Sequence, residues 1–488
     1  MNIFNKISFI LGNEQIEIDF TKSELKPTTT VLNFLRSYPN FKGVKEGCGE
    51  GDCGACTIVL AEPKTKNKLN YYAVDSCLVL LPMIHGKQVL TIEHLAQKNA
   101  NEIILHPVQQ AIVNNNASQC GYCTPGFAMS MFALYKNKFK PSKELVVDSL
   151  TGNLCRCTGY KPIIDAAISV CIGDDIDHFS NNENEIAKQL LGISKNQASI
   201  IIERNDQFYA KVFSLGDALK FKKMHKDAIF ISGATDIALK VSKMKENIKE
   251  IIDISSIQSL KYFQVSEDNY LIGSGISLEE LKNKTKNKIP ALHKALSVFG
   301  SKQIRNLATI GGNLGSASPI GDTLPVLIAH EAFILVKDLT KTRKIQINDF
   351  IKSYRKTAIN NTEIIIEISI PFPAKGTIIN SYKVSKRKDL DISTVSACFN
   401  LKLNNNNIVE KIILAFGGMA ATTQRAIITE EFLVGKKWEL KNIESAMEKI
   451  SKEFTPISDA RASENFRRLA SKNLLLKFYN DIKSGEIK

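Results

Sequence analysis

Apolar residues alternate with polar ones at the start of the chain, where they predict two short strands. The two sets are Ile7, Phe9 and Leu11, and Ile16, Ile18 and Phe20. Gly12-Asn13 stands between them, and this dipeptide favours the tight turn of a β-hairpin. With a helix expected over 31–36 and strands over 57–60 and 89–92, residues 1–93 are predicted to form a small α+β domain.

Beyond residue 94 the apolar period lengthens to that of a helix. Thr124 and Pro125 suit an N-cap and a first helical position. One face of the helix that follows carries Phe127, Ala128, Met131, Phe132 and Tyr135. We expect further helices over 94–113 and 143–150, and therefore a helical domain over 94–173.

The rest of the chain mixes strand and helix patterns. Residues 174–185 are acidic and Asn-rich without periodicity, so 174–199 is predicted to be a linker. Strands over 228–231 and 270–273 and a helix over 278–281 predict an α/β domain at 200–373. Strands over 397–403 and 409–415, followed by helices, predict another α/β domain at 374–488. The expected fold class is thus multidomain α+β.

Length and composition fit several globular domains. The 488 residues exceed what one hydrophobic core supports, and 44% apolar with 23% charged residues is ordinary for a globular protein. We find no apolar run long enough to span a bilayer, and the first 19 residues lack the continuous apolar stretch of a signal peptide. A cytoplasmic protein without membrane contact is therefore expected.

The positive charge does not by itself indicate nucleic-acid binding. Lys and Arg number 64 against 50 Asp and Glu, which gives a net charge of +14. The lysines are scattered, with no basic stripe interleaved with aromatic residues, and the seven histidines do not supply zinc-finger spacing. We expect no nucleic-acid partner.

The ten cysteines carry the first chemical signal, since nine of them precede residue 172. In a cytoplasmic chain of this size, such a density favours metal binding over disulfides.

One set has the spacing C-x4-C-x2-C with a fourth cysteine 21 residues later: Cys48, Cys53, Cys56 and Cys77. This is the plant-type ferredoxin pattern for a [2Fe–2S] cluster. Four glycines would let the loop wrap around a cluster and turn its N–H groups toward sulfur: Gly47, Gly49, Gly51 and Gly54. Zinc, the alternative, prefers paired C-x2-C knuckles.

A second set has the pattern C-x2-C, 31 residues, then C-x-C. Its members are Cys120, Cys123, Cys155 and Cys157. Both pairs lie at turns beside expected helices, so two helix ends could hold four thiolates. By spacing alone a four-cysteine zinc site is a fair alternative. Beside the first set, a second [2Fe–2S] cluster is the better interpretation. Cys171 and Cys398 are expected to be buried apolar cysteines.

The sequence around both sets resembles the xanthine dehydrogenase family of molybdenum hydroxylases. The stretches are EGCGEGDCGAC at 46–56, QCGYCTPG at 119–126 and TGNLCRCTGY at 151–160. The resemblance continues at 231–237, 303–313, 317–322, 354–357, 385–393, 416–420 and 454–459. It implies a [2Fe–2S] cluster on each set, a β-grasp ferredoxin-like domain and a four-helix cluster domain. It also implies a non-Rossmann FAD-binding domain and a C-terminal domain like that of the carbon monoxide dehydrogenase flavoprotein.

A FAD site made by two loops is also implied by the resemblance. Its residues would be Ile231, Ser232, Gly233, Ala234, Thr235, Asp236, Ile237, Phe299, Thr309, Gly312, Asn313 and Asp322. These types suit a diphosphate, because Gly233 and Gly311-Gly312 expose backbone N–H donors while threonine and asparagine add others. Asp322 could accept a hydrogen bond from a ribose or a ring donor. The chain contains neither G-x-G-x-x-G nor a Walker P-loop, in agreement with a non-Rossmann fold.

Two positions depart from the family pattern. Ala234 stands where many relatives carry Gly or Asn, and Lys388 stands where an aromatic residue is common. Neither change removes an expected ligand. Lys388 could alter the approach of NAD to the flavin.

The family oxidises its substrate at a molybdopterin centre on a much larger domain, for which this sequence has no counterpart. The resemblance therefore implies an oxidoreductase subunit for electron transfer. Electrons from hypoxanthine or xanthine, oxidised to urate on a large molybdopterin-binding subunit, would pass through the helical-domain cluster, the ferredoxin-type cluster and FAD to NAD. A heterodimer or a dimer of heterodimers serving purine catabolism is expected, with no catalytic acid, base or nucleophile on this chain.

Two other interpretations stay open. The same type of subunit could serve an aldehyde, nicotinate or aromatic acyl-CoA hydroxylase, because the pocket that selects the substrate would lie on the partner. The chain could also be a stand-alone iron–sulfur flavoprotein that carries electrons without a hydroxylase.

Overall fold

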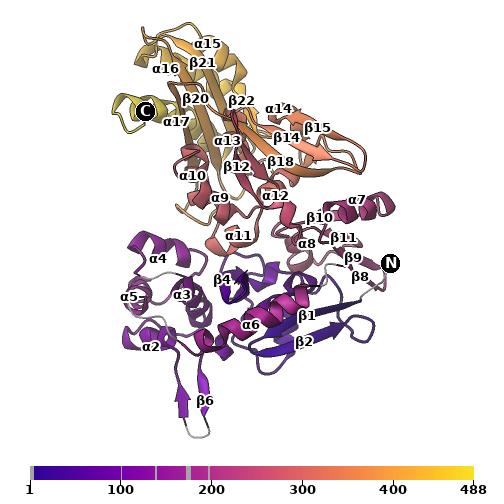
Figure 1. Cartoon of the computed structure of the whole chain (residues 1–488). Coiled ribbons are helices and arrows are strands. Elements are labelled where there is room, and N and C mark those ends of the chain that lie inside the picture. Colours follow the sequence, from indigo (N-terminus) through magenta and orange to yellow (C-terminus); the bar gives the residue numbers. More distant parts are fainter. Residues whose placement is uncertain (1–4, 100–101, 138–139, 172–176, 196–197, 488) are drawn as a thin grey trace. The chain divides into compact units, whose positions relative to one another are not determined.

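The computed structural model describes residues 5–99, 102–137, 140–171, 177–195 and 198–487 (Figure 1). The chain divides into two compact units. The first comprises Met1–Ile257 and Ser301–Ala308, and the second comprises Gln258–Gly300 and Thr309–Lys488. Among the described residues, no helix combines the length and the apolar character needed to cross a bilayer.

A mixed five-stranded sheet opens the first unit, in the order β2-β1-β5-β3-β4. Its strands and the helix after β2 are β1 (Lys6–Leu11), β2 (Glu14–Asp19), α1 (Val31–Ser37), β3 (Thr57–Thr65), β4 (Lys68–Asp75) and β5 (Gln88–Leu90). β1 and β2 pair antiparallel around Gly12, whose φ is +61°. β1 and β5 run parallel. The predicted hairpin and the β-grasp arrangement are therefore confirmed.

Four helices form the next part of this unit. They are α2 (Pro107–Asn114), α3 (Thr124–Asn137), α4 (Lys143–Leu150) and α5 (Lys161–Val170). The helix predicted over 143–150 is confirmed, and that predicted over 94–113 is wrong in its first half. There β6 (Gln97–Asn99) and β7 (Glu102–Ile104) form a projecting hairpin (Figure 1). Helix α2 begins only at Pro107, because proline favours a first helical position and disfavours helix before it.

The predicted linker over 174–199 contains a helix, α6 (His178–Ser194). Its buried residues include Phe179, Ile186, Ala187 and Leu190, which recur at helical spacing. The expectation of an irregular segment is wrong here, because the many Asn and Glu residues dilute this apolar face. The division of the chain at 93, 173, 199 and 373 stays a prediction.

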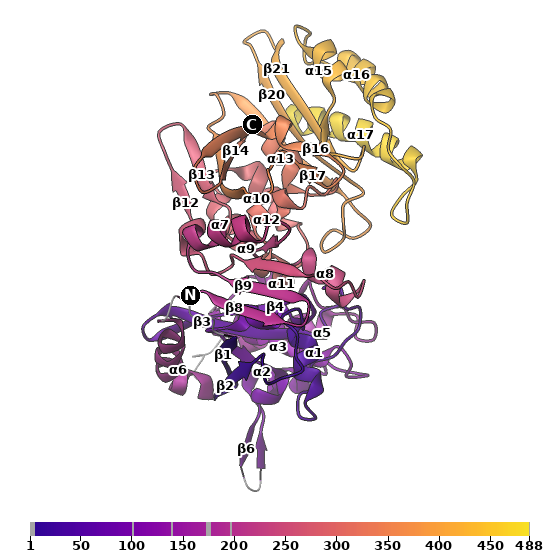
Figure 2. The same ribbon diagram turned by 90° about the vertical axis from the view of Figure 1, so that its right-hand side faces the viewer.

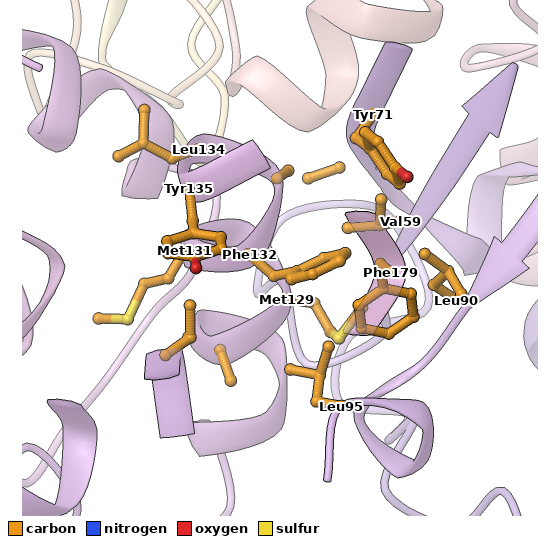
Figure 3. Close-up of a cluster of buried hydrophobic side chains, with 14 of the residues drawn as sticks. Val59, Tyr71, Leu90, Leu95, Met129, Met131, Phe132, Leu134, Tyr135 and Phe179 are labelled. Carbon is orange, nitrogen blue, oxygen red and sulfur yellow. The ribbon is translucent and has the colours of Figure 1, made fainter. Parts of the chain in front are cut away.

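The β-grasp sheet, α3 and α6 share one hydrophobic core (Figure 3). Tyr71 of β4 packs edge-on against Phe132 of α3, with ring centroids 6.0 Å apart. Phe132 also contacts Phe179 of α6, with centroids 4.9 Å apart. Cys123 and Cys155 of the second cysteine set pack against this core, whereas Cys56 and Cys77 of the first set belong to a neighbouring hydrophobic cluster.

A second sheet completes the first unit, in the order β10-β11-β9-β8. β11 pairs in parallel with both β10 and β9. The elements are β8 (Ile200–Arg204), β9 (Gln207–Lys211), α7 (Leu215–Met224), β10 (Ile229–Ile231), α8 (Ile237–Ser242), β11 (Glu250–Asp253) and α11 (Lys302–Leu307).

The second unit contains two larger sheets. The first has the order β12-β13-β18-β14-β15. Its strands are β12 (Phe263–Val265), β13 (Asn269–Gly273), β14 (Phe333–Lys337), β15 (Thr342–Gln346) and β18 (Ile364–Pro371). The helices and the short ribbon nearby are α9 (Leu278–Thr285), α10 (Pro290–Ser297), α12 (Ile310–Gly315), α13 (Thr323–Ala329), α14 (Ile347–Phe350), β16 (Ile351–Ser353) and β17 (Lys356–Thr357).

The other sheet has the order β19-β20-β21-β22. Its elements are β19 (Thr377–Val384), β20 (Val395–Leu403), β21 (Val409–Gly417), β22 (Gln424–Arg425), α15 (Ile427–Leu433), α16 (Leu440–Glu453) and α17 (Glu464–Lys483). Helices α15, α16 and α17 lie beside the long strands β20 and β21 (Figure 2) and share a core with them. The predicted multidomain α+β fold is confirmed.

Candidate redox-cofactor sites

The ferredoxin-type set converges at one end of the β-grasp sheet. Cys48, Cys53 and Cys56 lie in the loop before β3, and Cys77 follows β4. The Sγ atoms of Cys56 and Cys77 are 3.4 Å apart and both side chains are buried. Cys48 and Cys53 are half-buried and interact through their thiols. The four sulfurs thus form two pairs, and a [2Fe–2S] cluster takes two thiolates on each iron.

Backbone N–H groups surround the sulfur of Cys48. Those of Glu50, Asp52 and Cys53 each lie 3.4 Å from it. The thiol of Cys53 and these N–H groups outweigh burial and lower the pKa of Cys48 to about 5. The thiolate that iron ligation requires is therefore favoured at neutral pH.

Three glycines give this loop its path. Gly49, Gly51 and Gly54 have φ of +66°, +76° and +68°, a backbone region that other residues rarely adopt. The fourth, Gly47, makes room for sulfur, because a Cβ there would lie 2.8 Å from the Sγ of Cys53. The conformational freedom expected of the loop glycines is used at three of them, and the wrapping of the loop around a cluster stays a prediction.

The second set is also arranged as two pairs, Cys120 with Cys157 and Cys123 with Cys155. Cys120 and Cys157 are exposed, whereas Cys123 and Cys155 are half-buried. The N–H of Tyr122 and the thiol of Cys157 lower the pKa of Cys120. For Cys155, burial raises the pKa, but the hydroxyl of Thr158, 3.1 Å from Sγ, helps to bring it below its ordinary value. Two thiol pairs suit a two-iron cluster here as well.

The described residues contain no group of three or more His, Cys, Asp or Glu side chains placed to hold one metal ion. Cys171 and Cys398 are buried, as expected, and stand apart from both sets in the sequence.

Direct contacts connect the loops of the two sets. The N–H of Leu154 donates to the carbonyl of Cys53 over 3.0 Å. The hydroxyl of Tyr122 donates to the carbonyl of Glu46 over 2.7 Å, and Lys45 Nζ lies 3.2 Å from the carbonyl of Gly121. The first unit therefore brings the two sets together, although 42 residues separate Cys77 from Cys120 in the sequence.

The first expected flavin loop lies in the first unit, between β10 and α8. Ile231 ends the strand and Ile237 begins the helix. The N–H groups of 232–235 donate to no acceptor in the part of the chain that the structure describes. Such a run of unpaired donors suits an anion such as a diphosphate.

Gly233 and Ala234 shape this loop in different ways. A Cβ on Gly233 would lie 1.9 Å from the carbonyl oxygen of Leu307, so only glycine fits against α11. Ala234 has a φ of +57°, in the left-handed region that favours Gly and Asn. This explains why Gly or Asn would be common there. Asp236 follows at the N-cap of α8.

The second expected flavin loop lies in the second unit, around α12. Thr309 caps this helix by accepting from the N–H of Gly312 over 3.1 Å, and it accepts from the N–H of Asn313 at its carbonyl. The N–H of Gly311 donates to the carbonyl of Ser274 over 2.9 Å. The expectation that Gly311-Gly312 offers free N–H donors is therefore wrong. The surface around Gly312 is instead open, because a Cβ added there would meet only the hydroxyl of Thr309.

Asp322 is already engaged by two donors within the second unit. Lys383 Nζ lies 2.9 Å from Oδ2, and the hydroxyl of Ser393 lies 2.5 Å from Oδ1. Lys383 also donates to the carbonyl of Val298, next to the half-buried Phe299. Sequence reasoning missed Lys383, and the only signal for it was its place just before the family-like stretch at 385–393.

Three family models match successive parts of the chain. Residues 91–168 match the [2Fe-2S] binding domain. Residues 203–373 match the FAD binding domain in molybdopterin dehydrogenase. Residues 380–482 match the CO dehydrogenase flavoprotein C-terminal domain.

Similar full-length sequences are xanthine dehydrogenases. That of Emericella nidulans is 32% identical over 98% of this chain and 39% of its own length. That of Calliphora vicina is 30% identical over 99% of this chain and 39% of its own length. The chain thus spans about two fifths of the length of the curated relatives it matches.

Solved structures of two oxidoreductases share the fold of part of the chain. Carbon monoxide dehydrogenase from Hydrogenophaga pseudoflava aligns with a TM-score of 0.53 and 21% identity over 56% of this chain and 96% of the other. Quinoline 2-oxidoreductase from Pseudomonas putida 86 aligns with a TM-score of 0.54 and 20% identity over 58% of this chain and 99% of the other. Together with the paired cysteine sets, the family models and relatives show that the chain belongs to the iron–sulfur and FAD-binding proteins of the molybdenum hydroxylase family.

Proposed function

We propose that this chain is the electron-transfer subunit of a xanthine dehydrogenase. It would receive electrons from a molybdopterin-binding partner that oxidises hypoxanthine or xanthine to urate, and deliver them to NAD in purine catabolism. The observation that carries the proposal is the contact between the two paired cysteine sets, made by Leu154 and Cys53, in a chain that continues into flavin-type domains.

The cofactors divide the chemistry between them. When bound, two [2Fe–2S] clusters supply one-electron redox steps, and FAD links these to the two-electron chemistry of NAD. The chain's residues supply the binding sites: four thiols in each set for iron, and the N–H groups of 232–235 for the FAD diphosphate. Its eight ligand thiols suit a reducing compartment such as the cytoplasm.

The difference in exposure between the two sets supports an order of electron flow. Cys120 and Cys157 are exposed, and Tyr122 and Tyr160 beside them are 49% and 39% exposed. Cys56 and Cys77 of the other set are buried. Electrons from a docked partner would therefore enter at the helical-domain set and continue to the ferredoxin-type set.

The exposure of Cys120 and Cys157 supports a partner that docks on the helical-domain set. The matched segment covers 39% of the Emericella nidulans relative. We assign the molybdopterin centre to a second, larger subunit in a heterodimer or a dimer of heterodimers. The substrate pocket and any catalytic acid or base would lie on that subunit.

The test is to purify the tagged chain from its native host with whatever binds it. We expect about four irons and one FAD per chain, a large molybdenum-containing partner, and NAD reduction that depends on xanthine. The same cofactors and partner without xanthine activity would move the proposal to an aldehyde, nicotinate or aromatic acyl-CoA hydroxylase. Cofactors without any large partner would favour a stand-alone carrier. Zinc in place of iron, or the absence of flavin, would overturn the proposal.

A further inference from the structure

Helix α11 is attached to the cysteine-bearing parts of the first unit. Residues Ser301–Ala308 belong to this unit, although the chain on both sides of them belongs to the second. Lys302 donates to Ser149 over 3.1 Å, and the buried Arg305 pairs with Asp148 over 2.6 Å. Asn306 donates to the carbonyl of Ala73 over 2.8 Å. These bonds fix α11 to α4 and β4 at once.

A ladder of buried amides runs from α11 to both cysteine loops. Gln303 Nε2 donates to Asn153 Oδ1 and to the hydroxyl of Ser130, each over 2.9 Å. Asn153 Nδ2 in turn lies 3.0 Å from the carbonyl of Gly54 and 3.0 Å from the hydroxyl of Thr57. Gln303 and Asn153 are 0% and 2% exposed, so water does not compete for these bonds. The ladder therefore joins a residue next to Cys53 to a residue two before Cys155.

Three glycines leave room for the close approach of the segments joined by this ladder. A Cβ on Gly54 would lie 2.2 Å from the carbonyl oxygen of Gly152. One on Gly126, three residues after Cys123, would lie 2.2 Å from the carbonyl oxygen of Gly54. One on Gly152 would lie 2.1 Å from Oε1 of Gln303. At Gly54 and Gly126 a side chain would collide with backbone oxygens, so backbone atoms set the spacing there, whereas at Gly152 it would meet the side chain of Gln303.

Resting on the proposed electron-transfer function, we propose that Gln303 and Asn153 are positioning residues that set the separation of the two cysteine sets. They hold the Leu154 N–H against the Cys53 carbonyl, which is the direct backbone contact between the sets. With both clusters bound, one electron would pass between the sets without a proton or a bond change, so its rate would depend on their separation and not on acid–base groups. Electron tunnelling weakens steeply with distance, and a supporting shell that holds the loops within about 0.5 Å protects it.

The test compares two substitutions on the same helix in the purified complex. Gln303→Met keeps the side-chain volume and removes the two amide hydrogen bonds from α11 to Ser130 and Asn153. Lys302→Met removes the bond from α11 to Ser149 but leaves the amide ladder intact, so it serves as the matched control. The primary readout is the magnetic interaction between the two reduced clusters, measured by electron paramagnetic resonance. We expect Gln303→Met to weaken this interaction at unchanged iron content, and Lys302→Met to keep it at wild-type strength. An unchanged interaction in Gln303→Met would overturn the proposal.

Gly152→Ala provides a second route to the same displacement. Its Cβ meets the end of the flexible Gln303 side chain and the Cβ of Ser301, so it pushes the amide aside without leaving a cavity. We expect the interaction to weaken here too, which covers the case in which Gln303→Met does not fold. An interaction of wild-type strength in a folded Gly152→Ala protein would count against the proposal.

Hydrogen exchange tests the positioning role of Gln303 independently of the proposed electron-transfer function. The amide of Leu154 should exchange faster in Gln303→Met than in Lys302→Met, whether or not clusters are bound. If the wild-type chain bound no iron, the electron-transfer function would fail while this comparison still decided the positioning role. Equal exchange in the two variants would exclude that role.

Discussion

Lys383 and Asp322 form a buried ion pair, with an Nζ–Oδ2 distance of 2.9 Å and side chains that are 8% and 10% exposed. Lys383→Met would leave the carboxylate buried without its cation. Removing one partner of such a pair costs about 3 kcal/mol, so we expect a lower urea midpoint. The single tryptophan, Trp438, reports selectively on the second unit by fluorescence. The double variant with Asp322→Asn should regain part of the loss, because the unpaired charge is gone.

An exposed pair of the same unit provides the control. Lys402 and Glu410 are 39% and 43% exposed and 3.1 Å apart. Lys402→Met should change the free energy of unfolding by less than about 0.5 kcal/mol. If both lysine variants had the same urea midpoint, burial of the Lys383 pair would not matter. Flavin content measured in the Asp322→Asn protein tests separately whether this carboxylate contributes to the FAD site.

Removing one cysteine from each set should remove one cluster at a time. Cys77→Ala and Cys157→Ala are each expected to lower the iron content from about four to about two atoms per chain and to abolish one of two paramagnetic signals. Cys157 is exposed, so the fold should be unaffected, whereas the buried Cys77 should also cost stability. Cys398→Ala, in the second unit, should keep all the iron. Iron loss in that protein would contradict the ligand assignment.

Two glycines of the expected flavin loops should respond differently to alanine. At Gly233 the new Cβ would lie 1.9 Å from the backbone oxygen of Leu307, so Gly233→Ala should destabilise the first unit and lose FAD. At Gly312 the closest atom is the hydroxyl of Thr309 at 3.0 Å, so the fold should tolerate Gly312→Ala. Loss of FAD from a folded Gly312→Ala protein, measured by absorbance, would place the ligand against this exposed glycine. Full FAD content there would exclude such an approach.

Local patterns predicted local structure well. The hairpin around Gly12 and helix α4 follow from alternation and helical period over a few residues. The first cysteine set was also recognisable, because ligand spacing within a loop reflects cluster geometry, whereas spacing alone left a zinc site open for the second set. Helix α6 was missed because polar residues dilute its apolar face. The Gln303–Asn153 bond joins residues 150 positions apart, and no periodic signal carries such a contact. Lys383 was missed for the same reason, since its partner Asp322 lies 61 residues away.

Asp459 should make the stability of the second unit depend on acid pH. Burial raises its pKa, but the N–H groups of Arg461 and Ala462 and the guanidinium of Arg467 outweigh burial and lower the pKa to about 2. A carboxyl group with a lowered pKa stabilises the fold above its unfolded value of about 4, and this contribution is lost as the pH falls toward 2. Between these values the wild-type urea midpoint, followed by Trp438 fluorescence, should drop more steeply than that of Asp459→Asn. The variant should already be less stable near neutral pH, because the buried Arg467 loses its anion. Parallel pH profiles for the two proteins would show that Asp459 does not supply the acid-sensitive stability. The guanidinium of Arg467 would then be held by the carbonyls of Thr394 and Gly418.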